Sequence, residues 1–336
     1  MRTLNRASGF ATVALDLARM TDVALARARL RVVRERPALI VLNFHAVVRE
    51  ADDLRAHVIA PRWCLTVGEV GRCIEYFVNR GYIAVSPRDI VDGLGDDGRY
   101  VMFTFDDGYF NNSYVLPLLE KTGIPALFAI TTDAVVSGRS FWWDVLYRER
   151  TKGGVAPARI EAEAAPLMRE SAEAIERYLV LRFGPAALDP TGDVDRPFSP
   201  AELRAFASHP CVFLANHTAG HEWLPGCSAP SVERTLRRAQ DYLEEVAAVQ
   251  ALAVVYPFGD ASAEAVSVAR RLGLHLGFTT RMAKQVVPID GADEARMELP
   301  RFAISGDGAL KQCERARFDW RPTAQLRAAV RNLFSG

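Results

Sequence analysis

Residues 100 to 109 read "YVMFTFDDGY", an apolar run that ends on two adjacent carboxylates. Six residues that suit a buried β-strand lead directly into two carboxylates, Asp106 and Asp107, with Gly108 behind them. Adjacent ionised carboxylates repel each other, and removing either of them from water is costly. The pattern therefore predicts a strand whose carboxyl end carries a site that uses both charges. A plain "DDG" turn is the alternative, because such turns are common at strand ends.

Apolar runs of the same kind recur along the chain, with helix-like stretches between them. Near-continuous hydrophobic strands that alternate with helices are typical of a parallel sheet covered on its faces. About seven such units favour α/β architecture in the form of a distorted, incomplete (β/α)7-type barrel over an open sheet. The predicted strands are 38–44, 100–105, 126–131, 211–216, 251–258, 276–280 and 299–305, and the predicted helices are 66–80, 111–122, 200–207, 230–249 and 261–273.

The regular spacing breaks once, where roughly eighty residues separate the runs at 126–131 and 211–216. This segment opens with the aromatic "FWWDVLY" and continues with Ala- and Glu-rich sequence, which predicts a helical insertion over about 136–200. The barrel itself is expected over 37–312, followed by a tail or helix over 313–336.

Residues 1–36 carry apolar side chains at helical spacing with arginines between them, which predicts an amphipathic helix. Acidic residues interrupt this segment before a signal-peptide core or a membrane span develops. Two interpretations stay open. The first is a helix packed on the domain, which is favoured because such stripes are more often core; the second is a helix on a membrane surface. We expect a cytoplasmic protein in either case, with peripheral contact at the inner membrane face in the second.

The overall composition excludes several classes of protein. Lys+Arg and Asp+Glu are both 41, so the formal net charge is zero and a nucleic-acid partner is not expected. Hydrophobic residues make up 49% and charged residues 24%, as in ordinary globular proteins. The five cysteines form no CxxC pair, which favours reduced thiols in the cytosol over a disulfide framework.

Two histidines, His217 and His221, follow the predicted strand at 211–216 in "HTAGHEWL". They are four residues apart, so a helical turn would direct both imidazoles to the same side. Two histidines and one carboxylate make an open metal site, and a zinc-class ion lowers the pKa of bound water to ~7. One aspartate of the pair would then hold the ion, while the other stays ionised and acts as general base. A pair of structural histidines is the alternative interpretation.

The motifs "FTFDDGY", "NHTAGH" and "VYPFGD", in this order and spacing, resemble the polysaccharide deacetylases, the metal-dependent esterases of carbohydrate esterase family 4. "LNFHAV" and "ELPRFAISGD" resemble the branch of poly-N-acetylglucosamine deacetylases, and the likeness covers roughly residues 38 to 310. The resemblance implies a distorted (β/α) barrel of fewer than eight units. It implies Asp106 as general base and Asp107, His217 and His221 as ligands of one divalent ion. Zn²⁺ is the first expectation, with Co²⁺, Ni²⁺, Fe²⁺ or Mn²⁺ as alternatives.

The "YPFG" stretch resembles the family motif that lines the acetyl pocket and offers a backbone N–H to the oxyanion. The residues predicted to border the substrate on this ground are Tyr256, Pro257, Phe258 and Gly259. Many members carry an arginine just before this motif, where it holds the general base, but Val255 and Tyr256 stand there in this chain. Arg301 in "LPRF" is our candidate for the same role, and an ordinary surface arginine is the alternative.

The late histidine that protonates the leaving amine in many members is not evident in this sequence. His45 in "NFHAV" follows a predicted strand, so it is a candidate for acid or substrate contact, with a structural hydrogen bond as the equal alternative. Trp223 and the aromatic run Phe141, Trp142 and Trp143 are candidates for a surface that binds a sugar face. Tryptophans are more often buried anchors.

The resemblance implies an enzyme, a metal-dependent N-deacetylase that releases acetate from an N-acetylglucosamine-type sugar. The expected partner is an N-acetylated sugar within a glycan or a lipid-linked or nucleotide-linked precursor. A deformylase or O-acetyl esterase on a related glycoside is an alternative, because these reactions share one oxyanion. A catalytically silent glycan-binding protein on the same scaffold is the alternative from another class.

Overall fold

The computed structural model describes residues 28, 30, 34–289, 295–306 and 308–318. The chain divides into two units, one formed by Pro37–Cys313 and the other by Met1–Arg36 together with Glu314–Gly336. The predicted amphipathic helix over 1–36 and the tail over 313–336 lie mostly outside the described residues. No helix in the described ranges is both long and apolar enough to cross a membrane.

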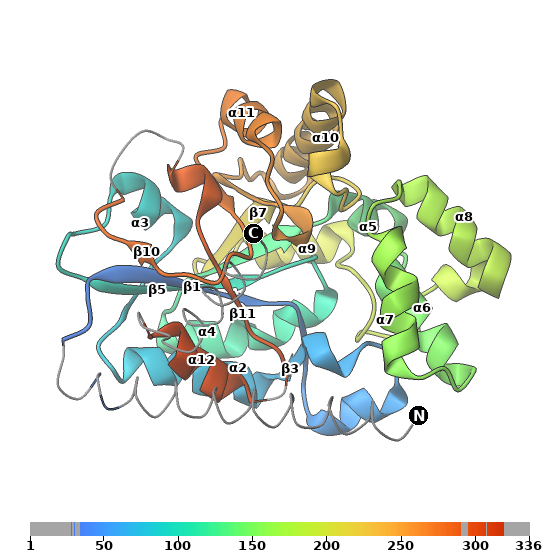
Figure 1. The fold of residues 1–336 in the computed structure, drawn as a ribbon, viewed down its shortest axis with the longest axis horizontal. Coiled ribbons are helices and arrows are strands. Elements are labelled where there is room, and N and C mark those ends of the chain that lie inside the picture. Colours follow the sequence, from blue (N-terminus) through green and yellow to red (C-terminus); the bar gives the residue numbers. More distant parts are fainter. Residues whose placement is uncertain (1–27, 29, 31–33, 290–294, 307, 319–336) are drawn as a thin grey trace, which may run out of the picture. The chain divides into compact units, whose positions relative to one another are not determined.

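A curled sheet forms the centre of the larger unit (Figure 1). Its strand order is β10-β1-β5-β6-β7-β8-β9, with β11 beside β1 and β4 beside β5. Every pair is parallel except β10 with β1. The strands are β1 Ala38–Phe44, β4 Ile83–Ala84, β5 Arg99–Phe105, β6 Ala126–Ile130, β7 Val212–Asn216, β8 Ala253–Val255, β9 Leu276–Phe278, β10 Gln285–Val286 and β11 Phe302–Ala303. The predicted fold class, an incomplete (β/α) barrel with a helical insertion, is confirmed.

The central strands are buried on both faces, which explains their continuous apolar sequence. Every residue of β1 and β6 is buried, and in β5 only the first residue is partly exposed. Phe44 pairs in register with Phe105, and Phe105 stacks on Phe128 of the next strand with ring centroids 4.9 Å apart. This packing fixes where β5 ends, so it also fixes where the two aspartates begin.

The last strand-like segment of the described chain connects the strand β9 to the strand β1. Leu299 forms a parallel bridge to Phe278 of β9, and Phe302 three residues later pairs with Leu42 of β1. The segment from Leu299 to Ala303 therefore lies between the last and first strands of the barrel. Arg301 is in the middle of this segment and is fully buried. We refer to residues 299–303 as the closing segment.

Helices cover the sheet, and three more build the insertion. Each predicted helix is present. The helix predicted over 200–207 has the observed bounds, the others are shifted by one to two residues, and 111–122 is divided between a 3₁₀ turn, η3 (Phe110–Val115), and α4. The covering helices are α2 Val67–Val78, α3 Pro87–Asp92, α4 Leu116–Thr122, α5 Thr132–Ser137, α9 Pro200–Ala207, α10 Ala229–Ala247, α11 Ala263–Arg271 and α12 Ala309–Ala316. A small second sheet of β2 Ala46–Val48 and β3 Cys64–Thr66 was not predicted, because three-residue strands carry too little pattern.

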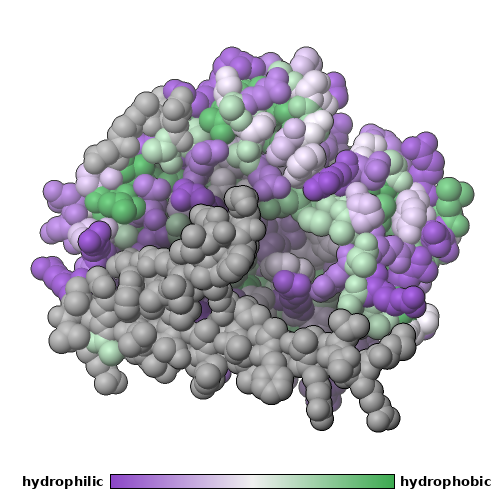
Figure 2. Space-filling view, in the orientation of Figure 1, coloured by the Kyte–Doolittle hydropathy of each residue, from purple (hydrophilic) through white to green (hydrophobic). Residues whose placement is uncertain are grey.

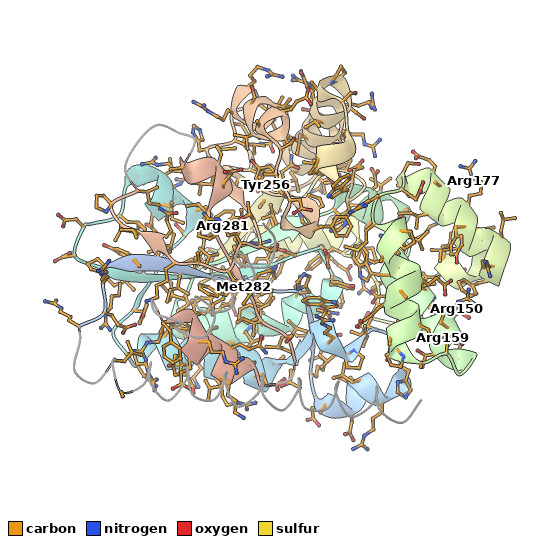
Figure 3. All side chains as sticks on the ribbon, in the orientation of Figure 1. Arg150, Arg159, Arg177, Tyr256, Arg281 and Met282 are labelled. Carbon is orange, nitrogen blue, oxygen red and sulfur yellow. The ribbon has the colours of Figure 1, made fainter. Side chains whose placement is uncertain are left out.

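The insertion has a hydrophobic core of its own. Its helices are α6 Trp142–Lys152, α7 Pro157–Leu167 and α8 Ala172–Phe183, and their apolar faces meet around Val145, Ile160 and Leu179. On the outer side, the guanidinium of Arg150 donates to both carboxylate oxygens of Glu163, which ties α6 to α7 (Figure 3). Figure 1 shows these helices beyond the carboxyl ends of β1 and β5.

Candidate metal centre and active site

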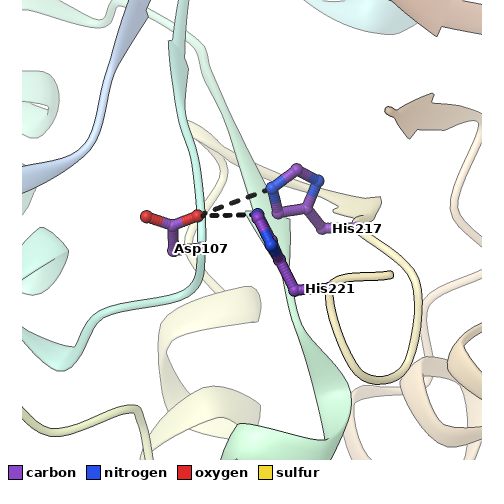
Figure 4. Close-up of side chains that lie close together, drawn as sticks. All are labelled: Asp107, His217 and His221. Carbon is purple, nitrogen blue, oxygen red and sulfur yellow. Dashed lines mark ion pairs between the residues drawn. The ribbon is translucent and has the colours of Figure 1, made fainter. Parts of the chain in front are cut away.

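Three potential metal ligands meet at the carboxyl ends of β5 and β7. Asp107 follows β5, His217 follows β7 directly, and His221 lies in the loop after it. The Oδ1 atom of Asp107 is 3.5 Å from the Nε2 atoms of both histidines, and the three ligand atoms lie within 4.8 Å of one another (Figure 4). All three side chains are almost fully buried. The structure therefore brings together the two histidines and the aspartate that the sequence singled out.

The chemistry of these atoms fits a divalent cation. His217 Nδ1 is 2.7 Å from the carbonyl oxygen of Val255, and since a carbonyl only accepts, this nitrogen carries the hydrogen. In the neutral ring, Nε2 then points a lone pair at the Asp107 carboxylate, so two acceptors face each other. Burial lowers the pKa of His221, which favours the neutral, ligating form of its ring. A backbone carbonyl that orients a ligating histidine in this way is a common feature of metal sites.

The backbone around this cluster is strained. Positive φ angles occur at Asp107 (77°), Thr218 (62°), His221 (60°) and Phe258 (60°), all of which are non-glycine residues. Such angles are uncommon outside glycine, and they concentrate at functional sites. The prediction of a helical turn between the two histidines was wrong, because His217–His221 is a loop with two left-handed residues. The imidazoles converge through this loop and not through helical spacing.

The second aspartate is held by the closing segment. Arg301 donates from its two terminal nitrogens to Asp106 Oδ1 and Oδ2, at 2.8 and 2.9 Å. The guanidinium also donates to the Thr279 carbonyl at 3.0 Å and to the Thr104 hydroxyl at 3.0 Å, which fixes its plane. Burial acts to raise the pKa of Asp106, but the charge and hydrogen bonds of Arg301, together with the charges of His217 and His45, hold that pKa below its ordinary value. Asp106 is therefore an ionised, oriented carboxylate beside the metal cluster.

His45, which follows β1, is close enough to both aspartates for a positive charge on its ring to lower the pKa of Asp106 and of Asp107. Its ring rests against Trp63 with centroids 5.0 Å apart, and Asn112 donates to its backbone carbonyl at 2.8 Å. Its buried Nδ1 atom has no hydrogen-bond partner among the described residues. The ring thus has a free nitrogen close to the site.

The "PFG" turn contacts the cluster, whereas the tyrosine before it does not. The ring of Phe258 stands edge-on to His221, with centroids 4.7 Å apart. Gly259 has φ +80°, and a Cβ there would come within 2.0 Å of the Thr280 side chain, so only glycine fits. Pro257 is buried in the same turn, η6 (Pro257–Gly259). The side chain of Tyr256 is fully buried and its hydroxyl lies against Gly277 (Figure 3), so its prediction as a substrate-bordering side chain is corrected to a core residue.

Trp223 is half-buried beside the loop that carries His221. Its indole N–H donates to Asp260 at 3.0 Å, and the guanidinium of Arg169 from the insertion lies 5.3 Å from its ring centre. These contacts anchor it between the loop after η6 and the insertion. Its role toward a substrate stays a prediction.

Sequence reasoning missed a buried polar group next to the cluster. The hydroxyl of Tyr109 donates to Asp144 Oδ2 at 2.5 Å and accepts from the indole N–H of Trp143 at 2.7 Å. Burial raises the pKa of Asp144 well above its ordinary value, although the Tyr109 hydroxyl donates to it. The one signal in the sequence was an aspartate inside the aromatic run "FWWD".

Comparisons with known proteins agree with this fold. The family profile described as "Polysaccharide deacetylase" matches residues 94–277, which is more than half of the chain. No curated protein gives a significant match. Among solved structures, the Streptococcus pyogenes deacetylase PplD in complex with acetate has a TM-score of 0.57 at 16% identity, covering 84% of this chain and 99% of that chain.

Two further structures are similar over most of their length. IcaB from Ammonifex degensii has a TM-score of 0.57 at 19% identity, covering 84% of this chain and 98% of that chain. A de-N-acetylase from Aggregatibacter actinomycetemcomitans has a TM-score of 0.52 at 16% identity, covering 82% of this chain and 99% of that chain. At these identities the likeness shows the fold, and the family profile shows the membership. This chain belongs to the polysaccharide deacetylase family.

Proposed function

We propose that this chain is a metal-dependent N-deacetylase, which hydrolyses the acetamide of an N-acetylglucosamine-type sugar and releases acetate. The observation that carries the proposal is the convergence of Asp107, His217 and His221 beside a second carboxylate, Asp106, that Arg301 holds in place. A structural metal site would close its ligand shell, usually with cysteines, whereas this set of three leaves positions open.

The open positions define what an ion would add to the site. When bound by Asp107, His217 and His221, a divalent cation would polarise the amide carbonyl as a Lewis acid and acidify a nearby water. Zn²⁺ is our first proposal, because nitrogen and carboxylate ligands in an open set suit it.

The chain's own residues then move the protons. Asp106 accepts a proton from the attacking water, and the bidentate contact from Arg301 keeps this carboxylate ionised and aimed. We propose that the backbone N–H of Phe258 donates to the oxyanion as it forms. His45, with its free ring nitrogen, is our candidate for the group that protonates the leaving amine.

The solved neighbours support the choice of acyl group and bond. One is described as a deacetylase in complex with acetate and another as a de-N-acetylase, and both share this fold. These descriptions support acetate as the product and an amide as the substrate here. The substrate we propose is an N-acetylated sugar that is part of a glycan or is lipid-linked or nucleotide-linked.

A direct test measures acetate release from N-acetylglucosamine oligomers, a lipid-linked N-acetyl sugar and a UDP-linked N-acetyl sugar. We expect release from at least one of them by protein loaded with Zn²⁺ or Co²⁺, and loss of release after chelation. Restored release on adding the metal back would separate metal dependence from damage by the chelator. Release that persists in fully chelated protein would refute the metal site, and no release from any N-acetyl substrate would refute the deacetylase.

A further inference from the structure

The first helix of the insertion places one tryptophan against the metal cluster. The ring of Trp143 lies 4.9 Å from that of His221, measured between centroids. On another side, the same indole stacks on Phe141, with centroids 5.1 Å apart and planes 10° apart. Trp143 stays partly exposed in this position. It is therefore an aromatic surface beside the proposed reaction centre, contributed by a segment outside the barrel.

The turn that carries the metal ligand also holds this tryptophan. Tyr109 comes two residues after Asp107, and its hydroxyl accepts from the indole N–H of Trp143 at 2.7 Å. The same hydroxyl donates to Asp144, the neighbour of Trp143 on α6. Because the only polar atom of the indole is occupied in this way, the surface that Trp143 presents is apolar.

Buried bonds at the base of the insertion fix the start of α6. Arg148, one turn after Asp144, pairs with the fully buried Asp195 near the end of the insertion, and Ser140 donates to the same carboxylate at 2.9 Å. Arg148 also donates to the Ala187 carbonyl at 2.6 Å. The two ends of the insertion are thereby tied together, so the position of the indole is set before any ligand arrives.

The adjacent tryptophan on the same helix has a different environment. Trp142 packs on the hydrophobic core of the insertion, whereas Trp143 packs with Tyr109, Phe141 and residues of the small β2–β3 sheet. Figure 2 shows the face between α10 and the insertion to be hollowed. The two indoles meet edge to face, with centroids 5.5 Å apart, and of the two it is Trp143 that lies against His221.

We propose that Trp143 binds the apolar face of the sugar ring that carries the acetamide, and that Tyr109 is a positioning residue that holds the indole in place. This inference rests on the proposed deacetylase function and names the residue that selects a sugar for it. A pyranose ring has a face of C–H groups, and an aromatic plane with no free polar atom complements that face. Under this proposal, the insertion contributes a residue to the substrate site.

Binding is measured first, in a background that cannot turn over. In metal-loaded Asp106→Asn protein, titration calorimetry with an N-acetylglucosamine oligomer should show Trp143→Ala weakening affinity roughly tenfold or more. The matched control is Leu181→Ala on α8 of the same insertion, a residue that is 81% exposed, and it should leave the affinity unchanged. Equal affinity of the Asp106→Asn protein with and without Trp143→Ala would overturn the proposal. Absence of oligomer binding by the Asp106→Asn protein that keeps Trp143 would also overturn it.

Turnover separates this inference from the function on which it rests. With protein of normal Asp106, we expect Trp143→Ala to raise KM for the N-acetyl oligomer at least tenfold, to lower kcat much less, and to leave metal content unchanged. The ratio of its kcat/KM for the oligomer to that for a small acetyl ester should fall, because the ester has no sugar ring. A parent that binds oligomer through Trp143 but releases no acetate would refute the function alone. A normally active Trp143→Ala variant would refute the inference alone.

The role of Tyr109 is tested by a double-mutant cycle. Tyr109→Phe removes only the hydroxyl, so it should raise KM severalfold in the parent and have little further effect when Trp143 is already Ala. Such coupling is expected of a residue that acts through the indole. An equal effect of Tyr109→Phe in both backgrounds would show a role independent of Trp143 and overturn this part of the proposal.

Discussion

Arg301 and Asp106 are 195 residues apart in the sequence and form a bidentate ion pair in which both side chains are buried. The arginine comes from the closing segment and the aspartate from the end of β5, so the pair connects the last part of the barrel to its centre. Two buried charges stabilise a protein only when each has an opposite charge beside it and its hydrogen bonds are made. Here the planar guanidinium provides both to the carboxylate.

Replacing Arg301 by Ala should leave a buried carboxylate with no counter-charge. We expect the free energy of unfolding to fall by about 3–5 kcal/mol, as measured by urea denaturation. Arg237→Ala is the matched control, since its side chain is 56% exposed in a surface pair with Glu233, and it should cost less than about 1 kcal/mol. Equal costs for the two variants would contradict the buried pairing.

The same variant should change the pH dependence of turnover. Arg301 lowers the pKa of Asp106 against the effect of burial, so without it burial raises that pKa. A base with a higher pKa loses its charge at a higher pH, and the acidic limb of the kcat/KM profile should therefore move to higher pH. Metal content should stay that of the parent, and an unmoved acidic limb would show that Asp106 is not the titrating base.

Single alanine variants of Asp107, His217 and His221 should each lose most of their bound metal after dialysis, as measured by elemental analysis. Each removes one of the three proposed ligands that converge among the described residues. His209→Ala is the control, because that histidine pairs with Glu120 at the surface, and it should retain metal. Parent-like metal content in all three variants would place the ion elsewhere.

Asp106→Asn should retain metal and lose hydrolysis. Because a positioned general base typically contributes about 10²–10⁴-fold, we expect a fall in kcat on that order. Asp241→Asn, an exposed carboxylate on α10, is the control and should turn over normally. A variant with near-parent kcat would remove Asp106 from the mechanism.

Gly259 and Gly273 make a matched pair for the turn beside His221. Both have φ of +80°, but a Cβ at Gly273 would meet nothing within 4 Å, whereas one at Gly259 would overlap Thr280. Gly273→Ala should cost about 1 kcal/mol from backbone strain, and Gly259→Ala about 1–3 kcal/mol more from overlap. Thermal unfolding of the two variants measures the difference, and similar costs would mean that Thr280 moves aside freely.

The centre of the barrel was predictable because β1, β5, β6 and β7 are apolar runs of five to seven residues. The run at 38–44 coincides with β1, and the run at 100–105 differs from β5 by one residue. The site was partly predictable for a related reason, since polar residues after buried strands stand out. Local patterns could not predict the loop that joins His217 to His221, because left-handed residues such as Thr218 carry no strong sequence signal.

Long-range pairing was also out of reach. The closing segment pairs with β1, at the other end of the barrel sequence, as well as with the nearer β9, and no local pattern predicts the pairing with β1. The different positions of Trp142 and Trp143 depend on which face of α6 packs inward, and that is settled by the core of the insertion. Tertiary packing therefore determines these features, which the spacing of apolar residues along the sequence does not predict.

The closing segment has a consequence for when the proposed activity arises during synthesis of the chain. Ribosomes synthesise residues 299–303 after every other barrel strand in the described sheet, so the proposed base gains its counter-charge only when this late piece docks. A nascent or partly opened chain would carry the metal ligands yet leave Asp106 without its guanidinium. Hydrolytic competence would then arrive together with completion of the barrel, and a nascent chain with an unfinished barrel would spare nearby acetylated sugars.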